Sequence, residues 1–236
     1  MLSAKPIKSD ERLILALDIP DPAGAKRLVE KLGDSVGFYK LGLELFMAGG
    51  YFELLEWLAA RGKKYFVDLK FFDVPPTVAS AVRQLRGRGA TFATVHGNDA
   101  MMKAAAAEKG DTKILAVTAL TSLDDGDLKA LGFAVDVRQL VLSRAKRALE
   151  LGCDGVIASG MEAAALRAEL GEKILIVVPG IRPVKNIDDQ KRTVDVEDAF
   201  KAGADYIVVG RPIRDAADPA RAAADMQARI RKLFAG

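Results

Sequence analysis

The chain has 236 residues, half of them hydrophobic, and a formal net charge of +3. This length supports a large core and fits either one barrel-sized domain or two small ones. The mild charge argues against a dedicated surface for nucleic acid or membrane, while leaving room for a small local anion site.

Residues 1–12 are polar and contain no apolar segment, so we expect no signal peptide. No apolar run approaches the roughly 18 residues that span a bilayer. The single cysteine, Cys153, cannot form an intramolecular disulfide, is typical of a reducing cytoplasm, and fits a small buried filler better than a nucleophile. We therefore expect a cytoplasmic protein and, because no linker-like tract divides the chain, one domain over residues 1–236.

Short apolar runs alternate with segments of helical spacing along the whole chain. The predicted strands cover residues 13–18, 36–42, 65–73, 92–96, 114–119, 155–158, 174–178 and 206–210. The predicted helices cover residues 22–32, 51–60, 76–88, 100–108, 137–151, 162–170 and 219–234. Strands that are apolar on both faces are typical of a parallel sheet.

Eight such units, of about 30 residues each, favour the α/β class and a single (β/α)8 TIM barrel. A doubly wound open sheet is the alternative. Such a sheet usually carries a Gly-rich turn after its first strand, and residues 18–22 contain no glycine.

Charged residues end the first three predicted strands. Side chains alternate across a strand, so Asp68 and Lys70 share one face of the run 65–73. The first strand delivers Asp18 and the second Lys40 to the same end, where the active site of a barrel lies. A structural ion pair is the alternative for any one of them, but three successive core strands ending in charge favour a functional site.

The alternation of sign predicts a chemistry. A carboxylate beside each lysine keeps it protonated, and each lysine keeps its neighbouring carboxylates ionised. A fixed carboxylate repels a second anion until that anion leaves as neutral carbon dioxide, and a fixed ammonium can protonate the carbanion left behind. Charges about 4 Å apart interact by only a few kcal/mol at an effective dielectric near 20, so stabilisation of the carbanion by Lys70 must dominate.

The last two strands predict a phosphate site. Arg182 follows the seventh strand, and Gly210 and Arg211 follow the eighth, where barrels commonly bind phosphate. The polar loop 182–192 adds Gln190 as a hydrogen-bond donor and could close over a ligand. Surface arginines on a solvated loop are the alternative, but a pair at adjacent strand ends favours phosphate.

Other polar residues near strand ends leave two readings open. His96, the only histidine, could touch the site or serve as a hydrogen-bonded structural residue. Thr121 and Ser122 could hydrogen-bond a heterocycle or cap a loop. No His, Cys and carboxylate cluster has metal-ligand spacing and no Gly-rich nucleotide fingerprint occurs, so we expect no metal and no cofactor.

Together these segments resemble the orotidine 5'-phosphate decarboxylase family, from Leu13 to Ile213. The resemblance is carried by residues 16–18, 39–42, 68–75, 120–122, 179–182 and 210–213. The Asp-x-Lys-x-x-Asp element alone is shared by a wider group of barrels; combined with Lys40 and the two arginine segments it is highly specific. The resemblance implies cofactor-independent decarboxylation of orotidine 5'-phosphate to UMP and carbon dioxide, the last step of de novo UMP biosynthesis.

By position, the resemblance also implies residue roles. Lys70 would protonate C6 of the pyrimidine and Asp68 would face the departing carboxylate, while Asp18 and Lys40 would contact the ribose hydroxyls. The remaining implied contacts are Thr121 and Ser122 near the pyrimidine, Arg182, Gln190, Gly210 and Arg211 at the phosphate, and Asp73 and Thr77 reaching across the interface of a homodimer.

Two segments depart from the family pattern. Pro76 stands where the family commonly has Asn, which affects the contacts expected of Thr77, and residues 97–100 replace a small-residue run with paired glycines. Two other functions stay open: a metal-dependent sugar-phosphate decarboxylase of the same suprafamily, acting on a keto acid, and a non-catalytic barrel that binds a phosphorylated metabolite.

Overall fold

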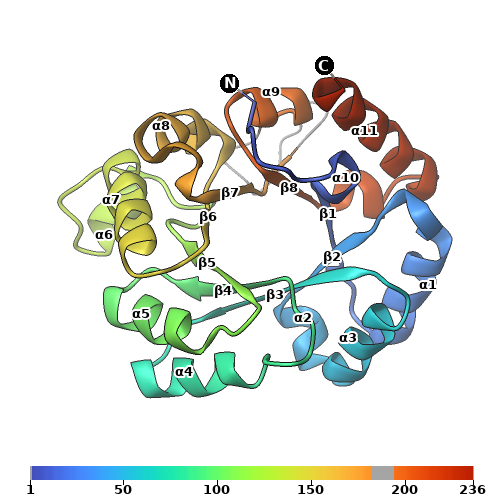
Figure 1. Ribbon diagram of the computed structural model, residues 1–236, viewed down its shortest axis with the longest axis horizontal. Helices are drawn as coiled ribbons and strands as arrows, with labels where there is room; N and C mark the ends of the chain where they lie inside the picture. The colour runs from blue at the N-terminus through green and yellow to red at the C-terminus, as the bar shows by residue number, and fades with distance from the viewer. Residues whose placement is uncertain (1, 182–193, 236) are drawn as a thin grey trace.

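The computed structural model describes residues 2–181 and 194–235. The strands close into one parallel barrel in sequence order, with β8 returning to pair with β1. Figure 1 shows the strands at the centre and the helices in a ring around them. The predicted (β/α)8 barrel is confirmed, and the doubly wound alternative is wrong.

All eight predicted strands are present. They are β1 (Leu13–Ala16), β2 (Phe38–Leu41), β3 (Lys64–Phe71), β4 (Phe92–His96), β5 (Lys113–Val117), β6 (Gly155–Ile157), β7 (Leu175–Val178) and β8 (Tyr206–Val209). Two predicted ends are corrected, because β1 stops at Ala16 and β3 at Phe71. Asp18 and Asp73 therefore lie on the loops that follow their strands.

The predicted helices are present with small shifts at their ends. The helices are α1 (Pro22–Leu32), α2 (Leu43–Met47), α3 (Tyr51–Ala59), α4 (Pro75–Arg83), α5 (Asp99–Glu108), α6 (Asp125–Ala130), α7 (Val137–Glu150), α8 (Gly160–Leu170), α9 (Val196–Lys201), α10 (Arg211–Arg214) and α11 (Pro219–Phe234), with 3-10 turns η1 (Ser9–Glu11), η2 (Gly33–Ser35) and η3 (Gly171–Lys173). The prediction that helix 76–88 extends to Arg88 is wrong, since α4 ends at Arg83.

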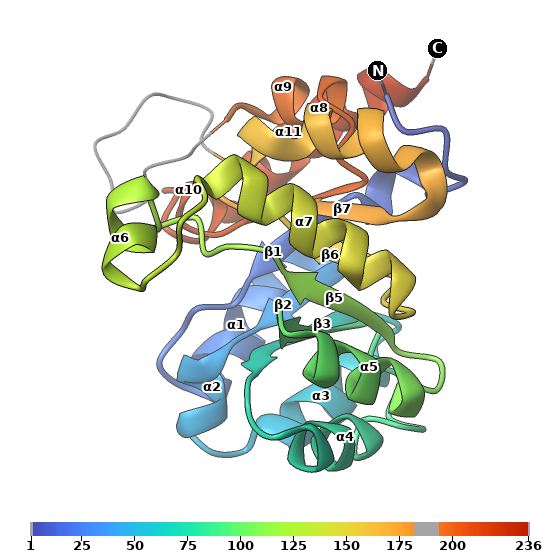
Figure 2. The same ribbon diagram turned by 90° about the vertical axis from the view of Figure 1, so that its left-hand side faces the viewer.

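Four short helices, α2, α6, α9 and α10, were not predicted. Each spans only four to six residues, too few for an amphipathic period to be recognised. The segment before residue 137, for which the sequence predicts no helix, contains α6, whose start is a capping box between Asp124 and Asp127. Figure 2 shows α2, α6 and α10 on one side of the barrel, the side at which the strands end.

Alternation of side chains along each strand builds two apolar layers. Leu13 and Leu15 point outward into the core between strands and helices, whereas Ile14 and Ala16 point inward. Toward the amino ends of the strands, the barrel interior is filled by aromatic rings. Phe92 has its ring centroid 5.3 Å from that of Phe38 and 5.1 Å from that of Tyr206. The interior is therefore packed toward the amino ends of the strands and open toward their carboxyl ends.

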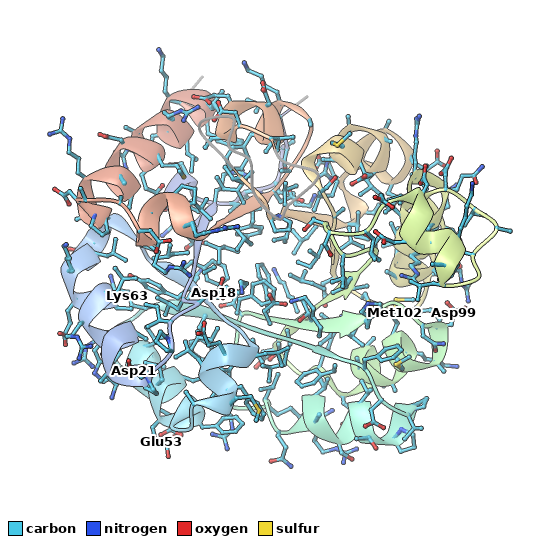
Figure 3. All side chains as sticks on the ribbon, turned by 180° about the vertical axis from the view of Figure 1, so that it is seen from behind. Asp18, Asp21, Glu53, Lys63, Asp99 and Met102 are labelled. Carbon is cyan, nitrogen blue, oxygen red and sulfur yellow. The ribbon has the colours of Figure 1, made fainter. Side chains whose placement is uncertain are left out.

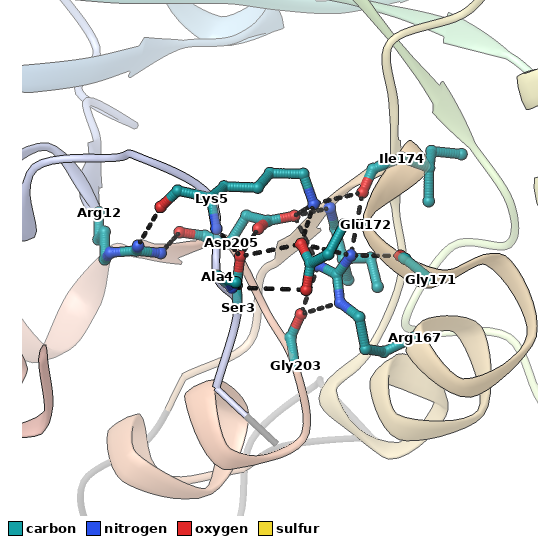
Figure 4. A network of polar contacts seen from close by, with 11 residues as sticks. Ser3, Ala4, Lys5, Arg12, Arg167, Gly171, Glu172, Ile174, Gly203 and Asp205 are labelled. Carbon is teal, nitrogen blue, oxygen red and sulfur yellow. Dashed lines mark hydrogen bonds and ion pairs between the residues drawn. The ribbon is translucent and has the colours of Figure 1, made fainter.

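Below these rings, a polar network ties the N-terminal segment to the barrel floor (Figure 4). Asp205, which is fully buried, accepts hydrogen bonds from the Ser3 hydroxyl and from Arg167 Nη2 at 2.8 Å. Lys5 Nζ lies 2.8 Å from a carboxylate oxygen of Glu172 and 3.3 Å from Asp205. The network joins the start of the chain to the starts of β7 and β8.

Cys153 is buried immediately before β6, and burial raises the pKa of its thiol to about 12. A thiol in this state is a filler rather than a nucleophile, as predicted. Within residues 2–181 and 194–235, no helix combines the length and the apolar character needed to cross a membrane.

Candidate active site

A cavity of about 370 Å³ opens at the carboxyl ends of the strands. Its walls come from seven of the eight strand ends and from α10. The lining residues are Ala16, Asp18, Lys40, Phe66, Asp68, Lys70, Val117, Ala119, Leu120, Thr121, Ile157, Pro179, Gly180, Val208, Gly210, Arg211 and Arg214. Figure 3 shows Asp18 inside the ring of helices, whereas Asp99 and Met102 belong to the outer layer.

The four charged side chains expected at the strand ends form one chain of alternating sign. Lys40 Nζ lies 3.3 Å from Asp18 Oδ1 and 3.2 Å from Asp68 Oδ2. Lys70 Nζ lies 3.0 Å from the other oxygen, Asp68 Oδ1. Asp68 is thus bracketed by two ammonium groups, and the geometry predicted from the strand pattern is found.

The central pair, Lys40 and Asp68, is almost enclosed by protein. Burial by itself would lower the pKa of Lys40, but the carboxylates of Asp68 and Asp18 outweigh it and raise that pKa. Burial would likewise raise the pKa of Asp68, but Lys40 and Lys70 outweigh it and lower that pKa. Both groups are therefore charged at neutral pH, and each fixes the charge of the other.

The backbone of β3 is irregular where it carries the catalytic candidates. Lys70 has φ of 47°, in the left-handed region. The pairing of β3 with β4 shifts between Val67 and Phe71. The Lys70 N–H is bonded to the hydroxyl of Thr94, at 2.9 Å. The bulge turns Asp68 and Lys70 together into the cavity.

The opposite wall of the cavity is apolar. Val117, Ile157 and Val208 line it at the ends of β5, β6 and β8. Thr121 also lines the cavity, whereas the neighbouring Ser122 is exposed and is not among the lining residues. A ring system lying in this cavity would have charged groups on one side and aliphatic groups on the other.

The predicted phosphate residues are placed in part. Gly210 and Arg211 line the cavity where β8 passes into α10, and Gly180 lines it after β7. Arg182 and Gln190 lie outside the described residues. Gly180, Gly210 and Arg211 lie at adjacent strand ends, a composition that suits an anion.

Asp73 and Thr77 do not line the cavity. Both are exposed, and Asp73 Oδ1 accepts the Val74 N–H at 2.6 Å. The same connection between β3 and α4 exposes two large apolar side chains, Phe72 at 68% and Val74 at 61%. His96 stacks edge-on against Phe72, and burial together with the nearby charges of Arg144 and Lys70 lowers its pKa.

Two polar residues of this region were not predicted from the sequence. Arg214 lines the cavity, and its Nη1 donates to the main-chain carbonyl of Asp18 at 2.6 Å. Its spacing of three residues from Arg211 would have placed both on one helix face, had α10 been recognised. Thr94 lies one layer behind Asp68, and no sequence signal distinguishes it from other threonines in strands.

In residues 2–181 and 194–235, no group of three or more His, Cys, Asp or Glu side chains is arranged to hold a metal ion. The cavity's charged wall instead pairs carboxylates with ammonium groups.

The family profile described as "Orotidine 5'-phosphate decarboxylase / HUMPS family" matches residues 11–226. A relative from Methylococcus capsulatus named orotidine 5'-phosphate decarboxylase is 64% identical over 236 residues, covering 99% of this chain and 98% of the relative. One of the same name from Stenotrophomonas maltophilia is 52% identical over 233 residues, covering 98% and 97%.

Solved structures give the same picture. The orotidine 5'-phosphate decarboxylase of Lactobacillus acidophilus superposes with a TM-score of 0.83 at 35% identity, covering 93% of this chain and 99% of that one. The one from Pyrococcus horikoshii superposes with a TM-score of 0.74 at 28% identity, again covering 93% and 99%.

Proposed function

Since this chain belongs to the orotidine 5'-phosphate decarboxylase / HUMPS family, we propose that it converts orotidine 5'-phosphate into UMP and carbon dioxide. It would act as a carbon–carbon lyase of the carboxy-lyase class, in one catalytic domain over residues 1–236. The reaction would complete de novo pyrimidine biosynthesis. The observation that carries the proposal is the Asp18–Lys40–Asp68–Lys70 chain of charges at the cavity.

In the proposed mechanism, Asp68 faces the carboxylate on C6 of the substrate. Two carboxylates about 4 Å apart repel each other by about 4 kcal/mol at an effective dielectric of 20. The bond between C6 and the carboxylate breaks, its electron pair stays on C6, and the repulsion ends as neutral carbon dioxide departs. Lys70 then donates a proton from Nζ to C6, and solvent returns a proton to the amine.

Repulsion of this size accounts for only part of the rate enhancement of an enzyme. The larger part is assigned to Lys70, whose positive charge lies where negative charge develops in the transition state. Lys40 would not transfer a proton. Held between Asp18 and Asp68, it would keep both carboxylates ionised and in place.

The rest of the cavity would bind the nucleotide. Asp18 and Lys40 would contact the ribose hydroxyls, the role that the family resemblance implies for them. The proposed contacts elsewhere are Thr121 and Ser122 at the pyrimidine, and Arg182, Gln190, Gly210 and Arg211 at the phosphate. The cavity volume of about 370 Å³ is in the range of small-ligand sites.

We also propose that the enzyme is a homodimer in which Asp73 and Thr77 complete the partner's site. Their exposure outside their own cavity and the two exposed apolar side chains beside them, Phe72 and Val74, support this arrangement. The net charge of +3 and the single cysteine support a cytoplasmic enzyme without nucleic-acid or membrane partners.

The central test is turnover by a Lys70→Ala variant. Formation of UMP from orotidine 5'-phosphate is expected to fall by more than about a thousandfold, since the proton donor and the main stabilising charge are both removed. Binding of UMP, measured by calorimetry, is expected to persist. Lys146→Ala, the same change at a half-exposed residue paired with Glu169, is the control. Near-normal turnover by Lys70→Ala would refute the assigned role.

Chelation separates this reaction from that of a metal-dependent sugar-phosphate decarboxylase. We expect full UMP formation after exhaustive treatment with EDTA. Loss of activity on chelation, restored by a divalent cation, would favour the other enzyme.

The shared site is tested by mixing two inactive variants, Lys70→Ala and Asp73→Asn. Half of randomly exchanged dimers are hybrids, and each hybrid holds one site with both Lys70 and Asp73 intact. Up to roughly a quarter of the sites should therefore regain activity. Demonstrated subunit exchange without recovery would count against Asp73 crossing the interface.

A further inference from the structure

The main chain at Lys70 is held in an unfavourable conformation. Lys70 is the only non-glycine residue with positive φ within residues 2–181 and 194–235. For an L-residue with a Cβ atom, the left-handed region is sterically unfavourable. Such a conformation persists only where surrounding contacts determine it.

One hydroxyl supplies contacts on both sides of this irregularity. Thr94 Oγ1 accepts the Lys70 N–H at 2.9 Å and donates to Asp68 Oδ1 at 2.9 Å. The pairing of β3 with β4 shifts at this point, and the Lys70 amide donates to the Thr94 hydroxyl where a regular strand would offer a main-chain carbonyl. Thr94 is fully buried and does not line the cavity, so it touches Asp68 and Lys70 from behind.

The same carboxylate oxygen also receives Lys70 Nζ, at 3.0 Å. The hydroxyl therefore closes a ring in which the Lys70 main chain, the Lys70 ammonium and the Asp68 carboxylate are fixed relative to one another. A methyl group in place of the hydroxyl could neither accept nor donate, and the ring would open.

We infer that Thr94 is a positioning residue, whose hydroxyl holds Lys70 in its left-handed conformation and aligns Asp68 with the Lys70 ammonium. The inference rests on the proposed decarboxylation. A proton donor displaced by a fraction of an ångström from its acceptor loses rate without losing the binding contacts made elsewhere in the cavity. Thr94 thus acts on the chemical step and not on nucleotide affinity.

The test compares Thr94→Val with Thr94→Ser. Valine keeps the shape and removes the hydroxyl, and is expected to lower kcat for orotidine 5'-phosphate by about tenfold to a hundredfold. The affinity for UMP should change by less than about threefold, because Thr94 does not line the cavity and makes no contact of its own with the nucleotide. Serine keeps the hydroxyl and should restore kcat to within about threefold.

Thr118→Val is the matched control. Thr118 is also fully buried at the mouth end of the barrel, and its hydroxyl donates to the Ile157 carbonyl at 2.8 Å without touching Asp68 or Lys70. It should cost comparable stability with kcat near that of the wild type. A crystal structure of Thr94→Val is expected to show Lys70 relaxed to negative φ.

The inference is overturned if Thr94→Val matches Thr118→Val in kcat, if serine fails to restore kcat, or if kcat and UMP affinity fall together. Should valine prevent folding, Thr94→Cys makes the same comparison, since a thiol is weak both as donor and as acceptor. Absence of UMP formation by the wild type would sink the proposed function itself. Wild-type turnover with an unaffected Thr94→Val variant would sink only the role of Thr94.

Discussion

The carboxylate of Asp68 lies between the ammonium groups of Lys40 and Lys70 in the cavity. Burial pushes its pKa up, and the two lysines, the Lys70 hydrogen bond and the Thr94 hydrogen bond bring it below the ordinary value of 3.8. A carboxylate with a lowered folded-state pKa contributes stability above its unfolded pKa, and this contribution is lost as pH falls through the folded value. Asp68 therefore stays ionised throughout the mildly acidic range.

Arg214 links two strand ends at the rim of the same cavity. Asp215 holds its guanidinium through two hydrogen bonds, of 2.6 and 2.9 Å, which leaves Nη1 to bind the Asp18 carbonyl. We expect Arg214→Ala to raise KM for orotidine 5'-phosphate by about threefold to tenfold, the effect of one lost charged hydrogen bond. Since Lys70 and Asp68 are untouched, kcat should stay within about twofold in steady-state assays.

Arg221→Ala removes the same charge from a side chain that is 81% exposed and should leave both constants unchanged. A KM for Arg214→Ala equal to that of Arg221→Ala would show that the contact with Asp18 does not matter for binding.

At the residue scale, the sequence was most informative where polar residues interrupt apolar runs. Asp18, Lys40, Asp68 and Lys70 could be placed together because a period of two fixes the face and the parallel barrel fixes the end. Thr94 could not be found in this way. Its contact with the Lys70 amide depends on the shift in the pairing of β3 with β4, and no residue type in the sequence predicts that shift. Of the neighbouring residues Thr121 and Ser122, both predicted near the pyrimidine, only Thr121 lines the cavity.

Among the elements, α9 and α11 are joined by a carboxylate–guanidinium cluster. Arg229 on α11 binds Glu197 on α9, with Nε to Oε1 at 2.6 Å, and also reaches Asp195. The hydrogen bond from Arg229 is the main cause that lowers the pKa of Glu197 to about 2 from an ordinary value of 4.5. Partial exposure of both side chains reduces the energy of this contact by solvent screening.

We expect Glu197→Gln to lower the free energy of unfolding by about 1 kcal/mol at pH 7. Because the folded-state pKa is depressed, the difference from wild type should be complete above pH 4.5 and should shrink as the pH falls toward 2. Urea unfolding at pH 7, 5 and 3 measures it.

Asp225→Asn is the control, since Asp225 meets Arg221 only at 4.0 Å and is 74% exposed. It should change stability by no more than about 0.5 kcal/mol. A Glu197→Gln deficit that stays constant from pH 7 to pH 3 would contradict the assignment.

Helices long enough to show an apolar period could be predicted, and the shorter ones could not. The range 22–32 matches α1 because Pro22 and the Asp21 cap mark its start and Gly33, at φ of 52°, marks its end. The helix α9 spans six residues, Val196–Lys201, and its cap Asp195 makes no capping hydrogen bond that would mark its start. Tertiary packing rather than local sequence decides such elements.

At the scale of the molecule, Asp205 makes most of the polar contacts at the amino ends of β7 and β8. It is fully buried, binds Arg167 at 2.8 Å, and accepts the Ile176 N–H at 2.8 Å. We expect Asp205→Asn to destabilise the protein by about 3–5 kcal/mol, since it removes the fully buried partner of the Arg167 guanidinium and leaves Glu172, 3.3 Å from Nη1 and partly exposed, as a counter-charge. Thermal unfolding followed by circular dichroism would measure the loss.

Asp154 offers a matched comparison before β6. It accepts the Ile114 N–H at 2.8 Å and binds Lys109 at 2.9 Å, but a quarter of its side chain is exposed. Asp154→Asn should cost markedly less than Asp205→Asn, because water can solvate the cation left behind. An equal loss of stability in the two variants would show that the burial of Arg167 is not the cause of the effect of Asp205→Asn.

The architecture of the whole chain was predictable because eight doubly buried strands leave few alternatives. What the strand pattern could not predict is the floor network, in which Ser3 and Lys5 meet residues far along the chain. Polar residues near the start of a chain carry no mark of such distant partners, and only closure of the barrel brings them together.

This floor network has a consequence for how the chain is made. Ser3 leaves the ribosome some 200 residues ahead of Asp205, which does not exist until synthesis reaches the start of β8. A nascent chain must therefore carry Lys5 without its carboxylate partners, Glu172 and Asp205, through most of translation. A chain released from the ribosome before Asp205 is synthesised would lack β8 and could not close the barrel. Such an incomplete chain would be a substrate for chaperones or proteases.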